Sequence, residues 1–202
     1  MFWFILFIIL LCFIFVVMKP ISNKKSSTAR IAPISPIFGK RYTWRFGKMT
    51  EADNVFDAWT SSDFNAMLAQ LNTDTNMIDR HHLLMSIISH AYKNRDDKEM
   101  RTICHQVAQL HIKEFPMIKA ALEKDFEGLP GLEGRCPHVP TFQQYATILT
   151  EEERFSEAIA VCESAIHFGL SDGTKGDFQG RIERIKKKEI KLKKLKNSEL
   201  GA

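Results

Sequence analysis

The chain has 202 residues, of which 45% are hydrophobic and 26% are charged. Four cysteines in a chain of this length exclude a small domain held together by disulfides. A transporter with several spans is also excluded, because residues 1–18 form the one apolar run of that length in the sequence. Beyond this run, about 184 residues are enough for one domain with a substantial core and hardly enough for two.

The charges are distributed in blocks. Residues 19–48 carry 8 Lys and Arg and no Asp or Glu, residues 49–177 carry 11 basic and 21 acidic residues, and residues 178–197 carry 9 basic and 2 acidic residues. The net charge of +4 therefore hides an acidic body between two basic ends. Such ends favour contact with a membrane surface or with an acidic partner.

Residues 1–18 contain no charged residue, glycine or proline, and they predict a transmembrane helix. A helix of this length measures about 27 Å, which just spans a hydrocarbon core of about 30 Å. A cleaved signal peptide is disfavoured because no basic residue precedes the run and Lys19-Pro20 follows it directly. A lipoprotein would be acylated at Cys12, but two leucines precede that cysteine where small residues are expected. We therefore expect an uncleaved membrane anchor.

The flanking charges predict the orientation of this anchor. Basic residues lie only on its C-terminal side, and the positive-inside rule then places the N-terminus outside and the rest of the chain in the cytoplasm. We expect a single-pass protein of the inner or plasma membrane, with reduced thiols in its body. Residues 19–48 form a basic linker rich in proline and serine. In this linker Lys24 and Lys25 either lie on anionic headgroups or only fix the topology.

We predict eight helices beyond the linker. After residue 41 apolar residues recur every three or four positions, and no run of alternating apolar residues indicates a strand. In chain order the helices cover about residues 50–59, 63–71, 79–92, 100–111, 115–126, 141–149, 156–168 and 178–197. The expected N-caps are Thr50, Ser62 or Asp63, and Asp79. Pro116 is expected to begin the fifth helix, and Gly169 to end the seventh. Residues 128–140, rich in glycine and proline, are predicted to be a loop. The expected fold class is all-α, with a transmembrane helix, a helical-hairpin domain at residues 49–177 and a basic C-terminal helix at residues 178–202.

Large and small residues follow a defined order over the sixth and seventh predicted helices. They are Phe142, Tyr145, Ala146 and Leu149, and then Phe155, Ala158 and Ala165. This pattern resembles a tetratricopeptide repeat, in which small residues let two helices approach closely and aromatic residues fill the gaps between hairpins. Residues 80–111 resemble a degenerate copy, with Ile103 where alanine is expected. The resemblance implies a groove lined by the first helix of each hairpin, where Gln143, Thr147 and Thr150 would contact a partner protein.

Residues suited to catalysis or metal binding follow none of the spacings that such sites use. A zinc site needs closely spaced ligand pairs, and the sequence has no CxxC or HxxxH pair. Cys104 and His111 are expected on an apolar helix face, whereas His81 and three further histidines are expected to face solvent. The glycine-rich residues 169–180 lack the spacing of a phosphate loop, and the acidic residues 151–153 are expected to form a solvated turn. We expect no enzyme, no metal and no cofactor.

The last predicted helix is amphipathic. Its apolar face contains Phe178, Ile182, Ile185, Leu192 and Leu195, and its opposite face contains Arg181, Arg184, Lys187, Lys188, Lys191 and Lys194. Three interpretations compete: the helix caps the domain, lies on an anionic membrane surface, or binds nucleic acid. Nucleic acid is the weakest of the three, because no aromatic stacking platform accompanies the charge. The first interpretation can coexist with the others if the lysine-rich end stays free.

From these features we expect a membrane-anchored adaptor or scaffold that binds an unidentified protein partner through its helical domain. The alternative is a protein that binds a membrane surface or nucleic acid through its basic linker and C-terminal helix. The salt dependence of binding distinguishes them, because purely electrostatic binding falls steeply with ionic strength.

Overall fold

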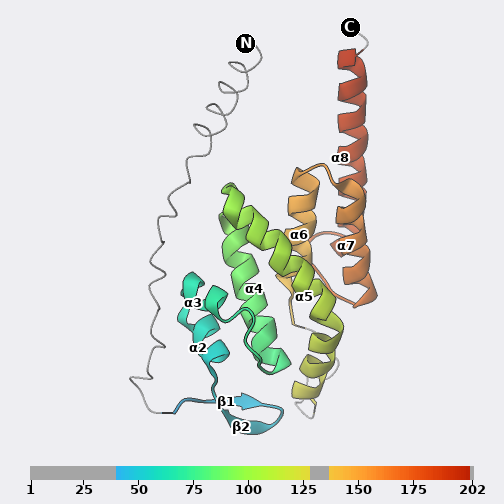
Figure 1. Ribbon diagram of the computed structural model, residues 1–202. Coiled ribbons are helices and arrows are strands. Elements are labelled where there is room, and N and C mark those ends of the chain that lie inside the picture. Colours follow the sequence, from blue (N-terminus) through green and yellow to red (C-terminus); the bar gives the residue numbers. More distant parts are fainter. Residues whose placement is uncertain (1–39, 128–136, 201–202) are drawn as a thin grey trace, which may run out of the picture. The chain divides into compact units, whose positions relative to one another are not determined.

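The computed structural model describes residues 40–127 and 137–200, which belong to one compact unit beginning at Lys40 (Figure 1). Within these residues a short β-hairpin is followed by seven helices. The elements are β1 (Tyr42–Arg45), β2 (Lys48–Glu51), α2 (Asn54–Ser61), α3 (Phe64–Ala69), α4 (Met77–Lys93), α5 (Lys98–Asp125), α6 (Pro140–Glu151), α7 (Phe155–His167) and α8 (Asp177–Leu200).

The predicted fold class needs two corrections. In the described part of the chain, no helix is both long enough and apolar enough to cross a membrane. The transmembrane helix predicted at residues 1–18, and the membrane anchor inferred from it, lie outside the described residues, so the fold class of the described chain does not include them. The all-α class is also wrong, because β1 and β2 pair as an antiparallel hairpin. Over residues 40–127 and 137–200 the fold is mostly helical with one β-hairpin.

The β-hairpin lies where the sequence predicts the end of a linker and the start of a helix. Trp44 of β1 is paired with Met49 of β2. Phe46 and Gly47 form the turn with positive φ angles of 50° and 69°, as in the type I′ turn whose twist matches that of paired strands. Glycine adopts this conformation freely, whereas phenylalanine rarely does. Helix α2 then begins only at Asn54, after the strand residues.

Arg45, at the end of β1, anchors the hairpin to α4. Its guanidinium contacts both carboxylate oxygens of the buried Asp79, at 2.5 and 3.3 Å. Asp79 also accepts hydrogen bonds from Trp59 Nε1 at 3.0 Å and from Asn76 Nδ2 at 2.6 Å. Burial acts to raise the pKa of Asp79, but these donors outweigh it and hold that pKa below its usual value. Asn76, rather than the predicted Asp79, caps α4.

Helices α4 and α5 form one hairpin, and α6 and α7 form another that packs against it (Figure 1). Helix α5 runs unbroken for 28 residues, whereas the sequence predicts two helices with the break before Pro116. Proline removes a backbone hydrogen bond from a helix interior. Phe115 and Ile118, on either side of Pro116, are fully buried, and their packing keeps the helix continuous.

Small and aromatic side chains fill the contacts within and between the hairpins. Ala146 of α6 and Ala158 of α7 are buried, which lets the two helices approach closely. The ring of Phe115 packs edge-on against Phe142 at 5.2 Å and against Phe168 at 5.1 Å. These rings join α5 to the end of the α6–α7 hairpin that lies opposite its turn.

Helix α8 packs the first half of its length against α7. Phe178, Ile182 and Ile185 are buried there. Further along the helix, Ile190 and Leu195 are 54% and 48% exposed. The capping interpretation therefore describes the first half of α8. In the second half Leu192 still packs against the core and Lys196 pairs with Glu153, whereas Ile190 and Leu195 face solvent.

Candidate binding groove

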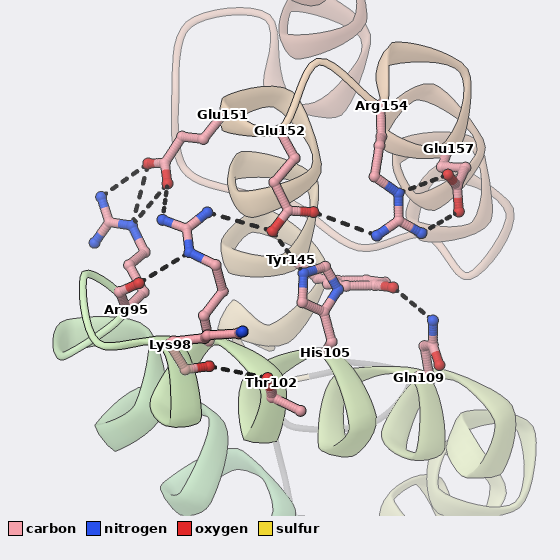
Figure 2. Close-up of polar contacts among 11 residues, drawn as sticks. Arg95, Lys98, Thr102, His105, Gln109, Tyr145, Glu151, Glu152, Arg154 and Glu157 are labelled. Carbon is pink, nitrogen blue, oxygen red and sulfur yellow. Dashed lines mark hydrogen bonds and ion pairs between the residues drawn. The ribbon is translucent and has the colours of Figure 1, made fainter. Parts of the chain in front are cut away.

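Charged side chains join α5 and the turn before it to the facing ends of α6 and α7 and the turn between them (Figure 2). We call this cluster the ion-pair belt, and its members are Arg95, Arg101, His105, Glu151, Glu152, Arg154 and Glu157. Contacts across the belt join residues 47 to 56 positions apart in the sequence. The belt therefore holds the two helical hairpins in a defined relative position.

Glu151 accepts hydrogen bonds from two guanidinium groups (Figure 2). Arg95 donates to it from Nε at 3.1 Å and from Nη2 at 2.9 Å, and Arg101 donates from Nη2 at 3.3 Å. The hydrogen bonds from Arg95 are the main reason that the pKa of Glu151 lies below its usual value. The sequence predicts a solvated turn here, but two of its three glutamates, Glu151 and Glu152, connect the hairpins.

Glu152 lies at the centre of the belt. Its carboxylate is 2.8 Å from His105 Nε2 and accepts hydrogen bonds at 3.3 Å from both Arg101 and Arg154. Burial acts to raise the pKa of Glu152, but these donors lower it overall. Arg154 also donates from Nε and Nη2 to Glu157, each at 2.7 Å. Together these contacts leave each carboxylate in the belt paired with at least one cation.

Tyr145 of α6 lies at the edge of the belt and leads into a groove. Its ring meets His105 edge-on at 5.4 Å, and its hydroxyl accepts a hydrogen bond of 2.8 Å from Gln109 Nε2 (Figure 2). Burial raises the pKa of Tyr145, so the phenol is neutral at physiological pH. The hydrogen bond between the Tyr145 hydroxyl and the Gln109 amide therefore joins two uncharged groups.

The groove is open to solvent, has a volume of about 360 Å³ and lies between α5, α6 and α7. Its lining comprises Gln109, Ile112, Lys113, Tyr145, Leu149, Glu157, Ala160 and Val161. Tyr145 and Leu149 are buried and form its floor, while Lys113, Glu157 and Ala160 are exposed at its rim. Apolar surface with a few polar groups at the edge is typical of a site that binds a side chain or a small ligand.

The chemistry of the belt suits recognition better than proton transfer. A general base works best when its pKa lies near the ambient pH. Glu152, paired with His105, has its pKa moved away from that range. Cys104 is buried with its thiol toward Ile88 of α4, and burial raises its pKa to about 12, so the thiol is protonated. Among residues 40–127 and 137–200, no group of three His, Cys, Asp or Glu is placed to hold a metal ion.

The predicted partner-binding residues lie on a different face of α6. Thr147 Oγ1 donates to Gln143 O and accepts a hydrogen bond of 3.3 Å from Arg181 of α8. The hydroxyl of Thr150 donates to the backbone of its own helix, and its carbonyl accepts from Lys188 Nζ at 3.1 Å. Two of the three residues therefore contact α8, and their role in partner binding stays a prediction. Local sequence patterns do not identify the groove side chains, because these come from three different helices.

The predicted anion-binding residues divide into three groups. Lys24 and Lys25 lie outside the described residues. Arg181, Arg184 and Lys188 are used within the fold: Arg181 pairs with the buried Asp172 at 2.7 Å, Arg184 binds the hydroxyl of Thr174 at 2.9 Å, and Lys188 binds Thr150. Lys187, Lys191 and Lys194 are exposed and make no ion pair within residues 40–127 and 137–200.

A second polar cluster is fully buried in the core. His81 Nδ1 lies 2.9 Å from His111 Nε2, and His111 Nδ1 lies 2.8 Å from Thr141 Oγ1, so the cluster joins α4, α5 and α6. Within the described part of the chain His81 Nε2 has no hydrogen-bond partner. Burial lowers the pKa of His81 to about 3 and that of His111 well below its usual value, so both rings are neutral. The prediction that His81 faces solvent is wrong, because it falls in the same helical stripe as the buried Leu84 and Ile88.

No family model, curated protein or solved structure matches the chain. The tetratricopeptide-repeat and protein-binding assignments therefore gain no support from known proteins, and the repeat assignment is set aside. The structure establishes two packed helical hairpins, and any function has to be argued from the surface that they form.

Proposed function

We propose that this protein is a helical adaptor that binds a short acidic segment of a partner protein in the groove between α5, α6 and α7. The observation that carries the proposal is the apolar floor of Tyr145 and Leu149 in an open groove directly beside the ion-pair belt. The belt fixes the two hairpins whose contact creates the groove, so the site exists before a ligand arrives. Such preorganisation lowers the entropy cost of binding.

The size of the groove supports a peptide side chain as the ligand. Its volume of about 360 Å³ is at the lower end of the range for small-molecule sites. One or two large apolar side chains would occupy it, with burial contributing about 25 cal/mol per Å² of apolar surface. The rest of the segment would run along the exposed rim.

The charges at the rim support an acidic segment. In the belt, three arginines face three glutamates, and each glutamate accepts at least one arginine hydrogen bond. Lys113 is exposed at the rim and makes no ion pair with a described residue. The uncompensated charge at the groove is therefore positive, and it favours an Asp or Glu beside the apolar anchor.

The test is a selection from a peptide-display library on the purified full-length protein, followed by fluorescence polarisation with the selected peptide. We expect selected peptides to combine a large apolar residue with a neighbouring Asp or Glu. Ala160→Glu places a carboxylate in the groove and is expected to weaken binding by about tenfold or more, which corresponds to about 1.4 kcal/mol. Ile166→Glu adds the same charge to an exposed position of the same helix outside the groove, and it should bind as the unchanged protein does.

Either of two outcomes overturns the proposal. One is a selection that yields no apolar and acidic consensus. The other is equal binding by the Ala160→Glu and Ile166→Glu proteins, because the peptide would then bind elsewhere. Far-UV circular dichroism of both variants establishes that they are folded before binding is compared.

A further inference from the structure

The second half of α8 extends beyond the helix on which its first half packs. Helix α7 has 13 residues and α8 has 24, which correspond to about 20 and about 36 Å. The last turns of α8 therefore extend past α7, although Leu192 still packs against the core and Lys196 pairs with Glu153. The covered part is firmly held, because Phe178 and Ile182 are buried and Arg181 pairs with the buried Asp172.

The solvent-facing side of α8 presents a row of lysines, which begins in the first half of the helix and continues into the second. Lys187, Lys191 and Lys194 recur at spacings of four and three residues, so they lie on one face of the helix, about 10 Å from first to last. This face is opposite the one that carries the buried Ile185. In contrast, Lys193 pairs with Glu189 and is not part of the row. We call Lys187, Lys191 and Lys194 the lysine row.

We infer that the lysine row binds the phosphate backbone of nucleic acid without regard to sequence. Closely spaced cations that lack partners in the fold repel one another, and a polyanion relieves that repulsion along its whole length. Duplex DNA carries about one negative charge per 1.7 Å of its axis, so about six phosphate charges lie along the roughly 10 Å of the row and supply partners for all three lysines. Three lysines by themselves form no array of donors and acceptors that selects one base sequence, so we expect phosphate contacts to determine the affinity.

Two other occupants fit the surface less well. A helix that lies in a membrane interface needs a continuous apolar face. The exposed apolar residues here, Ile190 and Leu195, are five positions apart and therefore about 140° apart around the helix, so they form no such face. A protein interface is usually centred on a buried aromatic or apolar anchor, and the lysine row supplies none.

Fluorescence anisotropy with a short labelled DNA duplex tests this inference on the full-length protein. We expect weak binding whose affinity falls steeply between about 50 and 200 mM salt. Substituting all three lysines of the row by glutamate should lower the affinity by at least tenfold and reduce the salt slope by about 3, close to one for each lost phosphate contact. Substitution of the same three residues by arginine should preserve binding, because the charge remains.

A variant with the same change in net charge provides the control. Lys48, Lys93 and Lys98 are exposed, make no ion pair within the described residues and lie on other elements, so their replacement by glutamate should leave most of the binding intact. An equal loss in this control would assign the binding to net charge and overturn the inference. So would an unchanged salt slope in the lysine-row variant, or binding to vesicles containing phosphatidylserine with no binding to the duplex. Circular dichroism of each variant establishes that it is folded.

Discussion

Replacing His81 and His111 by leucine, singly and together, tests whether the buried histidine pair stabilises the fold only as a neutral, hydrogen-bonded unit. Each single substitution removes the partner of the other ring. The remaining imidazole nitrogen then stays buried without its hydrogen bond, which costs about 1–3 kcal/mol in addition to any change in packing. The double substitution removes both polar rings, so we expect it to destabilise the protein by less than the sum of the single substitutions.

The same pair makes stability depend on pH. Burial lowers the folded-state pKa of His81 to about 3, whereas a histidine in the unfolded chain titrates near 6.5. Between these values the unfolded chain binds a proton that the folded chain does not, so acidification favours unfolding. The loss approaches about 1.4 kcal/mol per pH unit below the unfolded pKa, which amounts to about 2 kcal/mol from His81 between pH 6.5 and 4.5. His111 acts in the same direction, because its pKa is also lowered by burial.

Urea unfolding followed by far-UV circular dichroism measures both effects. Measurements made above about pH 4.5 exclude most of the contribution from Asp79. The pKa of an aspartate lies below that pH in the unfolded chain, and the fold lowers the pKa of Asp79 further. The unchanged protein should lose at least about 2 kcal/mol between about pH 6.5 and 4.5, and the double leucine variant should lose much less. An identical loss in the double variant, or strictly additive single substitutions, would refute the reasoning.

Two further predictions concern the anchors at either end of the helical unit. Arg45→Met leaves Asp79 buried without its cation and should lower the free energy of unfolding by about 3–5 kcal/mol. Arg41→Met breaks only an exposed pair with Asp57 and should lower it by less than about 1 kcal/mol. Similar losses for the two variants in urea unfolding would contradict the anchoring role of Arg45. Gly180→Ala would place a methyl carbon 2.6 Å from the carbonyl oxygen of Lys175 and should lower the free energy of unfolding by about 1–3 kcal/mol. Substitution of the exposed neighbour, Gln179→Ala, should leave that free energy almost unchanged. An unchanged urea midpoint for Gly180→Ala would show that the loop before α8 moves aside.

The helices were predictable where local sequence features agree with packing. Predicted residues 141–149 and 156–168 match α6 and α7 closely, because apolar residues recur with helical spacing and Gly169 ends α7 with a φ of 71°. The first half of α8 was predictable for the same reason. Its three buried apolar residues follow one face at spacings of four and three.

The β-hairpin and the unbroken α5 were not predictable from local features. The turn has phenylalanine at Phe46, where Asn or Asp usually indicates a type I′ turn. At Pro116 the local preference is for a helix start, and tertiary packing of Phe115 overrides it. Similarly, the ion-pair belt joins residues about fifty positions apart, so no local pattern distinguishes its glutamates from those of a solvated turn.

The position of the groove follows from the length and placement of α8. In an array of helical hairpins, the first helix of a hairpin normally keeps one face open, and Thr147 and Thr150 lie on that face of α6. Here Arg181 and Lys188 of α8 bind these two residues, so α8 occupies the face. The surface that remains open is the one where α6 meets α5 and α7, with Tyr145 as its floor. Because α8 covers the expected binding face, the available recognition surface lies on the other side of α6. The solvent-facing side of α8 itself provides a separate basic surface.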